Sequence, residues 1–284
     1  MTGRKSPNCW DEKRRVEGRK SPNCWEDFGP RASGWANYTL VMPGLYRDEG
    51  VVLRTIKLGE ADRIVTVLTQ GHGKVRAVAK GVRKTSSRFG ARLEPMSRVA
   101  LQCYRGRELD VVTQAETLDA NRVLREEYGL LTHAVPMLEA VDQVAQEHEP
   151  NPALYRMLTG ALRALADLKN PLVTSAFFWK LLSLEGIHPM LDGCARCGRE
   201  AGGDDAALIA FDLDEGGTLC RGCARGGGWP LSHPALDLLR RMLSGGLNGV
   251  FAQPPGPETH EVEQLGIRAV EHHVERRLRS TALL

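Results

Sequence analysis

The sequence predicts an α+β protein in which a small N-terminal β-barrel is followed by an α-helical domain containing a four-cysteine ribbon. Short runs of alternating apolar and polar residues fill residues 44–118, and this alternation is typical of half-buried strands. Apolar residues recur at helical spacing through much of residues 119–284. Two Cys-x-x-Cys pairs interrupt this helical region, which indicates a metal-binding ribbon at about residues 190–228.

The bulk properties favour a cytoplasmic protein of about two domains. The chain has 284 residues, and roughly 150 residues per domain is a usual ratio. No apolar run reaches the roughly 20 residues of a membrane-spanning helix, and the charged N-terminus lacks the apolar core of a secretory signal. We therefore expect no membrane association. Thiols stay reduced in the cytosol, so clustered cysteines there suggest metal more than disulfides.

The first forty residues carry a direct repeat. Residues 3–10 (GRKSPNCW) recur as residues 18–25. Two short polar copies cannot stack into a repeat fold, and Cys9 and Cys24 lie outside any compact ligand spacing. We expect residues 1–41 to be a disordered tail or a mis-assigned start.

Five short strands are expected in the N-terminal region. Residues 70–73 (QGHG) separate the second strand from the third and predict a tight hairpin turn. In the third strand, small apolar residues alternate with Arg76, Val78 and Lys80, which predicts one apolar and one cationic face. Cys103 alternates with apolar neighbours and is expected to be a buried thiol. Five strands in about 70 residues favour a small closed barrel, and the OB-fold is the nucleic-acid-binding barrel of this size. The expected strands are residues 51–53, 64–69, 74–80, 99–103 and 109–113.

Positive charge is concentrated in this barrel. Residues 74–107 contain ten Lys or Arg and one acid, Glu94, so this segment has a net charge of +9 within a chain whose net charge is +3. Such asymmetry points to a surface for a polyanion, although a solvated basic face is the plainer alternative. Cations, hydroxyls and glycines in residues 81–92 suit phosphate oxygens. The candidate DNA-binding residues are Lys74, Arg76, Lys80, Arg83, Lys84, Arg88 and Arg92.

Other features of the barrel leave choices open or argue against catalysis. Phe89 could stack on a base or close one end of the barrel. Residues 71–74 (GHGK) are followed by Val75 rather than Ser or Thr, so they do not make a phosphate-binding loop. Glu60 and Asp62 have no third acid or histidine at metal spacing. We therefore do not expect a nuclease or another enzyme.

From Thr117 onward, apolar residues recur at the spacing of a helix instead of alternating as in a strand. Apolar residues at helical spacing continue to Val141, and Pro136 is expected to divide or kink this helix. Residues 153–168 predict a second amphipathic helix. Residues 171–186 predict a third, begun by a first-turn proline and apolar enough to be the central core helix.

Two more helices are expected near the C-terminus. Ser232 is a candidate N-cap for a helix that runs to Leu243. A last helix is expected from Glu258 to Arg279, and His272 and His273 on it are interpreted as exposed polar residues. Its final turn would hold Arg276, Arg277 and Arg279 near the negative end of the helix dipole.

The four cysteines of the ribbon are Cys194, Cys197, Cys220 and Cys223. Each Cys-x-x-Cys pair makes a turn that directs two thiolates inward, and two pairs supply the tetrahedral shell that structural zinc prefers. A shell of four protein ligands leaves no open position, so one structural zinc ion is expected. An iron–sulfur cluster or a redox dithiol is the alternative.

Residues 44–280 resemble the RecO family of bacterial recombination mediators. The order of parts is the same: an OB-like barrel, a helical bundle, and a four-cysteine ribbon within the bundle. The motifs that carry the resemblance are residues 50–54 (GVVLR), 59–64 (GEADRI), 73–74 (GK), 79–84 (AKGVRK) and 92–95 (RLEP).

The resemblance implies a function in DNA repair. Such proteins bind single- and double-stranded DNA, anneal complementary strands and work with RecR. They help to displace single-stranded DNA-binding protein so that the RecA recombinase can load. Some members of the family lack the four cysteines, which fits a scaffolding role for the metal.

Two other functions fit the residues less well. A zinc-ribbon protein of RNA metabolism or transcription would also combine a barrel with a ribbon. A protein adaptor could use the basic face to dock an acidic tail, and single-stranded DNA-binding proteins carry such tails. If the basic face binds DNA, charge reversal at Arg83, Lys84 and Arg88 should weaken binding, and salt should weaken it steeply.

Overall fold

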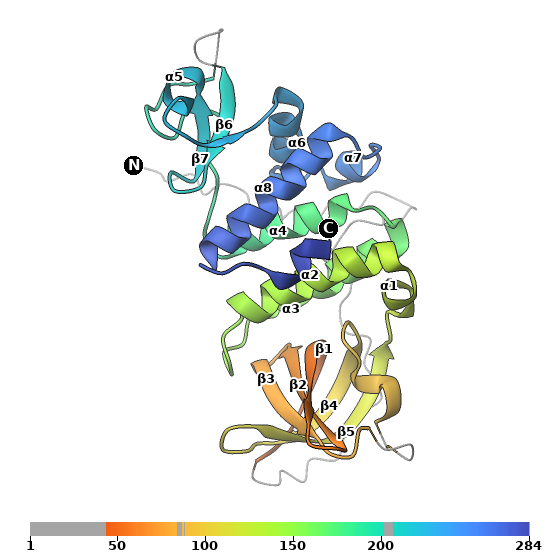
Figure 1. Ribbon diagram of the computed structural model, residues 1–284. Helices are drawn as coiled ribbons and strands as arrows, with labels where there is room; N and C mark the ends of the chain where they lie inside the picture. Colours follow the sequence, from red (N-terminus) through yellow and green to blue (C-terminus); the bar gives the residue numbers. More distant parts are fainter. Residues whose placement is uncertain (1–43, 84–86, 88, 202–206, 284) are drawn as a thin grey trace, which may run out of the picture.

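The computed structural model describes residues 44–83, 87, 89–201 and 207–283. A β-barrel lies at one end, a cysteine-bearing ribbon at the other, and the helices lie between them (Figure 1). The repeated segment at residues 1–41, together with Lys84 and Arg88, falls outside the described residues. Within those ranges, the helices are too short or too polar to cross a membrane.

Five strands close the barrel in the order β1-β2-β3-β5-β4. Neighbouring strands are antiparallel except β3 and β5, which are parallel. The long strand β1 pairs with β4 through its first half and with β2 through its second half, and a bulge separates Val52 from Arg54. The closed five-stranded barrel confirms the expected OB-fold. The strands are β1 (Leu45–Leu58), β2 (Asp62–Thr69), β3 (Gly73–Ala79), β4 (Arg98–Tyr104) and β5 (Asp110–Asp119).

The third strand has the predicted two faces. Val75, Ala77 and Ala79 are buried in the barrel, whereas Arg76 and Val78 are partly exposed on the outside. The hairpin turn predicted before this strand is present, because β2 ends at residue 69 and β3 begins at residue 73 in antiparallel pairing. The cations of β3 therefore project from the outer surface.

The barrel interior is closed by an aromatic side chain. Phe89 is only 4% exposed and packs with the barrel core, so it closes the barrel instead of presenting a stacking surface. Cys103 is buried as predicted. Burial raises the pKa of the Cys103 thiol to about 12, so this thiol stays protonated at neutral pH.

The helical region begins later than the sequence predicts. The prediction that helical structure begins at Thr117 is wrong, because β5 continues to Asp119 and pairs with β4. The break between α1 and α2 falls at Glu127, which has extended backbone, whereas Pro136 lies inside an uninterrupted helix. The helices are α1 (Arg122–Glu126), α2 (Tyr128–Val144), α3 (Pro152–Leu168), α4 (Leu172–Leu184), α6 (His233–Leu243), α7 (Leu247–Phe251) and α8 (Pro257–His273).

Helix α4 is the central helix of the core, as predicted. Phe177, Phe178 and Trp179 are almost fully buried along it. The indole Nε1 of Trp179 donates a hydrogen bond to the carbonyl oxygen of Val262 in α8 at 3.2 Å, so the one polar atom of this ring has a partner. A Cβ added at Gly266 would lie 3.0 Å from that indole nitrogen, so a glycine there lets α8 approach α4 closely.

The C-terminal segment turns back after α8. This helix ends at His273, so the expectation that the three C-terminal arginines form its last turn is wrong. Glu275 adopts a positive φ of 51°, which ends the helical path. A short 3-10 helix, η2 (Arg279–Leu283), then lies beside α2 (Figure 1). Glu139 of α2 accepts hydrogen bonds from the backbone N–H groups of Arg279 at 2.9 Å and Ser280 at 2.8 Å, and from the Ser280 hydroxyl.

The barrel packs directly on the helices. Val51, Leu53 and Leu68 belong to the same apolar core as the buried residues of α2 and α3. Backbone hydrogen bonds join Lys74 to the segment after α2 in both directions, from Lys74 N to Gln146 O and from His148 N to Lys74 O. The interface is therefore both apolar and hydrogen-bonded.

Candidate metal centre and nucleic-acid interface

A three-stranded sheet carries the cysteine cluster between α4 and α6. Its strands are β6 (Leu208–Asp212), β7 (Gly217–Cys220) and β8 (Trp229–Pro230), in the order β7-β6-β8, and the short helix α5 (Arg221–Ala224) follows β7. Cys220 ends β7 and Cys223 lies in α5, while Cys194 and Cys197 lie in the turn before the sheet. The sequence predicted this ribbon from cysteine spacing alone.

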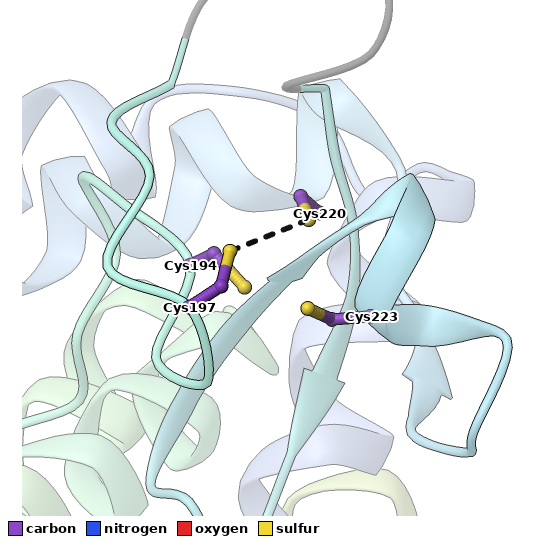
Figure 2. Close-up of side chains that lie close together, drawn as sticks. All are labelled: Cys194, Cys197, Cys220 and Cys223. Carbon is purple, nitrogen blue, oxygen red and sulfur yellow. Dashed lines mark hydrogen bonds between the residues drawn. The ribbon is translucent and has the colours of Figure 1, made fainter.

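The four sulfur atoms converge on one point (Figure 2). All four lie within 4.8 Å of one another, and the Sγ atoms of Cys197 and Cys220 are 3.9 Å apart. Cys194 and Cys220 are buried, whereas Cys197 is exposed. One ion surrounded by four sulfurs would thus be held at the surface of the ribbon by ligands from two separate turns.

Backbone hydrogen bonds shape the first turn. The N–H of Gly198 donates to the carbonyl oxygen of Cys194 at 2.8 Å, and Gly198 has a φ of +71°, a conformation that favours glycine. The N–H of Ala195 donates to the carbonyl oxygen of Thr218 at 2.8 Å, which fixes this turn against β7. These contacts position the first pair of thiols relative to the second pair.

The thiols of the cluster shift one another's pKa values in opposite directions. Burial raises the pKa of Cys194, but hydrogen bonds from the backbone N–H groups of Cys220, Cys197 and Arg196 lower it to about 6. The hydrogen bond with Cys194, together with burial, raises the pKa of Cys223 to about 12. Four thiolates cannot share such a small volume without a positive charge among them. A divalent metal that prefers sulfur would supply that charge.

Arg196, which sequence analysis did not single out, connects the first cysteine turn to the rest of the ribbon. Arg196 lies between the two cysteines of the first pair and contacts Asp212 at 2.6 Å and Glu215 at 3.3 Å. It also donates to the carbonyl oxygen of Cys223 at 3.1 Å. Its position between ligands was visible in the sequence, but its partners lie 16 to 27 residues away and are brought close only by the fold.

Three of the candidate DNA-binding residues lie on or beside the outer face of β3. Arg76 projects outward opposite Thr66 of β2, and Lys80 is exposed just beyond the strand. Arg83 is also exposed, and its guanidinium lies 3.4 Å from the carbonyl oxygen of Gly59 in the turn between β1 and β2. Arg76 faces Glu147 at 3.6 Å, a solvent-exposed pair of the kind that contributes little to stability.

The remaining candidates are placed differently. Lys74 is only 13% exposed, and its ammonium donates to the carbonyl oxygen of Asp142 at 2.6 Å, so it joins the barrel to α2. Arg92 is exposed in the 3-10 helix η1 (Gly90–Leu93) and lines hollows beside β4 and β5, away from the outward row of β3. Lys84 and Arg88 are outside the described residues. DNA contact by all seven candidate residues stays a prediction.

A polar network in the barrel was not found from the sequence. The Tyr46 hydroxyl donates to Asp110 at 2.5 Å, and the Tyr46 ring lies against the His72 ring with 4.3 Å between centroids. His72 in turn contacts Asp48 at 2.6 Å. Burial and the hydrogen bond to Asp110 raise the pKa of Tyr46. This network fixes the β2–β3 hairpin against β1, and only the closed barrel brings its members together.

Two family models match the chain in sequence order. Residues 42–121 match the model described as Recombination protein O N terminal. Residues 125–282 match the model described as Recombination protein O C terminal. The first match covers the barrel, and the second covers the helices together with the cysteine-bearing ribbon.

Proposed function

This chain belongs to the RecO family of DNA-binding recombination mediators in DNA repair, and from that premise we propose that it anneals complementary single strands. We further propose that it acts with RecR to help RecA load on DNA coated by single-stranded DNA-binding protein. Bacterial DNA lies in the cytoplasm, and this is where we expect the protein to act.

The observation that carries the proposal is the outer face of β3. Annealing requires no nucleophile or general base, but it requires a surface that neutralises phosphates without regard to sequence. Arg76, Lys80 and Arg83 present such charges from the outside of a closed barrel. A strand held there has reduced phosphate repulsion toward its complement. Neither single nor double strands need to enter the barrel, whose interior is filled by apolar side chains.

We propose that the metal is one structural zinc ion bound by Cys194, Cys197, Cys220 and Cys223. The four sulfurs are close enough to share one ion, and the donor set is that of structural zinc sites. Zinc would supply positive charge that holds four thiolates together. The four cysteines fill the tetrahedral coordination shell of such an ion, so no position is left open for chemistry on a substrate.

The proposed protein partners follow from the family and from charge. RecR is expected as a partner because the family works with it. The acidic tail of single-stranded DNA-binding protein is expected to bind a basic surface of this chain. If DNA and a synthetic tail peptide compete for the chain, the two ligands share a surface; if both bind at once, they use separate surfaces.

The first test is annealing of complementary oligonucleotides coated with cognate single-stranded DNA-binding protein, without ATP. We expect annealing well above the rate without this protein, and a steep fall in rate as salt increases. Binding to DNA without acceleration of annealing would refute the annealing function. Preference for RNA over DNA of the same sequence would favour the alternative role in RNA metabolism. Intact DNA after incubation with magnesium or manganese would exclude a nuclease.

A further inference from the structure

A groove lies between the barrel and the C-terminal segment. It encloses about 560 Å³ and is lined by β1, by α2 and by the segment that follows α8. The three cations that line it are Arg54, Arg276 and Arg279, and the two acids are Glu139 and Asp142. The two C-terminal arginines reach the groove because the chain turns back after α8 instead of continuing as a helix.

Both acids form hydrogen bonds or ion pairs with neighbouring residues of the protein. One carboxylate oxygen of Glu139 accepts a hydrogen bond from Arg279 N, and the other accepts from the backbone N–H and the hydroxyl of Ser280. Asp142 is 12% exposed, and one of its oxygens accepts from Arg54 Nε at 2.5 Å while the other lies 3.6 Å from the Lys74 ammonium. Their negative charge is therefore directed toward the protein.

The three arginine side chains are accessible to solvent. The Arg54 side chain is 43% exposed and uses Nε for its bond to Asp142. Arg276 is exposed, and one of its terminal nitrogens donates to Gln143 at 3.4 Å. Arg279 is exposed as well, and it is its backbone N–H that binds Glu139. A guanidinium has five N–H donors, so each arginine can still donate to a phosphate.

Strand pairing relates Arg54, which lines the groove, to Arg76 on the outer face of β3. Arg54 of β1 is paired with Thr66 of β2, and Thr66 is paired with Arg76 of β3. Residues that are paired across adjacent strands project on the same face. Neighbouring strands are about 4.8 Å apart, so the backbones at Arg54 and Arg76 are separated by roughly 10 Å. Arg54 and Arg76 thus project from the same face of the barrel, on either side of Thr66, which is only 1% exposed.

We propose that this groove is a second phosphate-binding segment of the DNA interface, formed by Arg54, Arg276 and Arg279. It rests on the proposed function, since it extends the path of a strand bound to the outer face of β3. The strand passes from the barrel onto the C-terminal segment. The helical region thereby contributes to DNA binding, which no pattern in the sequence assigns to it.

The test compares two variants of the full-length protein. In Arg276→Gln/Arg279→Gln, the two C-terminal arginines of the groove lose their charge. The matched control is Arg277→Gln, which removes an exposed charge from the same segment but outside the groove lining. Affinity is measured by fluorescence anisotropy with single strands of increasing length at several salt concentrations. Far-ultraviolet circular dichroism and thermal unfolding report whether each variant is folded.

We expect the double variant to bind long single strands several-fold more weakly than the parent protein. Loss of two phosphate contacts should reduce the slope of log K against log salt by about 1.4. Strands too short to leave the barrel should bind both proteins equally, and the Arg277→Gln control should resemble the parent. Phenylglyoxal modification mapped by mass spectrometry provides a second measurement, in which DNA should protect Arg276 and Arg279 but not Arg277.

The outcomes separate this proposal from the proposed function. If the parent protein binds no DNA, both fail. If the parent binds DNA but the double variant has the same affinity and salt slope, or if DNA leaves Arg276 and Arg279 unprotected, the groove proposal is overturned and the barrel interface stands. A length-dependent loss in the double variant together with protection of these two arginines supports it.

Discussion

The ammonium of Lys74 lies 2.6 Å from the backbone carbonyl oxygen of Asp142, and the carboxylate of the same residue lies 3.6 Å from that ammonium. These two residues are 68 positions apart in the chain and belong to the barrel and to α2. Removal of the Asp142 charge would leave the largely buried Lys74 ammonium without its counter-charge, whereas Asp142 also pairs with Arg54 at 2.5 Å. Lys74 and Asp142 therefore hold the barrel on the helical region.

Asp142→Asn should destabilise this interface. We expect a loss of about 1–3 kcal/mol in the free energy of unfolding, because the Lys74 ammonium loses its counter-charge in a largely buried position. Urea unfolding followed by fluorescence measures it. A double-mutant cycle with Lys74→Met is the control: the Lys74→Met substitution should cost less when Asp142→Asn is already present than it costs alone. Additive losses would show that the pair does not couple.

The outer face of β3 should carry much of the affinity for DNA. Arg76→Glu/Lys80→Glu is expected to weaken binding by at least an order of magnitude at low salt, because two phosphate contacts become repulsions. Anisotropy titration with a labelled single strand measures the effect. Arg156→Glu/Arg163→Glu on α3 makes the same change in net charge at exposed positions. Equal loss in both variants would mean that only net charge matters, and would contradict a specific interface on β3.

Phe89 should matter for stability and not for stacking. Because it is 4% exposed in the barrel core, Phe89→Ala should cost about 3–5 kcal/mol in unfolding free energy. Phe89→Leu, which retains most of the volume, should cost far less. Thermal unfolding and DNA affinity are measured on the same preparations. A variant that keeps full stability but loses affinity for single strands would reverse this assignment.

Removal of the metal should affect the ribbon far more than the barrel. Cys223→Ser is expected to lose bound zinc and to lower the unfolding temperature, while its salt-dependent DNA binding persists through the barrel. Metal content is measured by atomic absorption after gel filtration. Cys103→Ala removes a cysteine buried in the barrel core, outside the cluster, and should retain one zinc ion per chain. Metal-free parent protein with unchanged unfolding would argue against a structural site.

Glu139 should make stability depend on pH. Burial raises its pKa, but hydrogen bonds from the Ser280 hydroxyl and from the backbone of Arg279 and Ser280 outweigh burial and lower the pKa below the ordinary value. A carboxylate with a lowered folded-state pKa contributes stability that is fully present above its unfolded pKa of about 4.3 and is lost as pH falls through the folded value.

The measurement compares Glu139→Gln with the parent across pH. The difference in unfolding free energy should be constant from about pH 6 to 8 and should shrink below about pH 4.3. Glu126→Gln changes an exposed carboxylate and should show no such difference. If the difference in unfolding free energy between Glu139→Gln and the parent stayed the same down to about pH 3, the assigned role of this carboxylate would be contradicted.

The sequence predicted the parts of the fold that are encoded locally. Alternation in the third strand revealed its buried and exposed faces because a strand reverses side-chain direction at each residue. Ser232 was recognised as a helix cap, and its hydroxyl accepts from the N–H of Ala235 at 3.3 Å. The cysteine spacing predicted convergence of four thiols because each turn is short and self-contained.

What the sequence could not predict depends on contacts between distant residues. The extension of β5 to Asp119 is decided by pairing with β4, and the apolar residues there also fit a helical period. Lys74 is indistinguishable from Arg76 in the strand pattern, yet only Lys74 meets an acid from α2. The turn after α8 depends on Glu139, which lies 140 positions before Arg279.

The hydrogen bonds that Glu139 accepts from Arg279 and Ser280 also impose an order on folding during synthesis. The barrel is contiguous in sequence, so all of its strand partners have left the ribosome before α2 is complete, and domains generally fold as units from the N-terminus. Helix α2, by contrast, emerges long before η2, and the Glu139 carboxylate stays without these partners until Arg279 and Ser280 have been made. The barrel can thus form on a nascent chain whose groove is still incomplete, and the proposed DNA path from the barrel to Arg276 and Arg279 becomes available only once that segment has emerged.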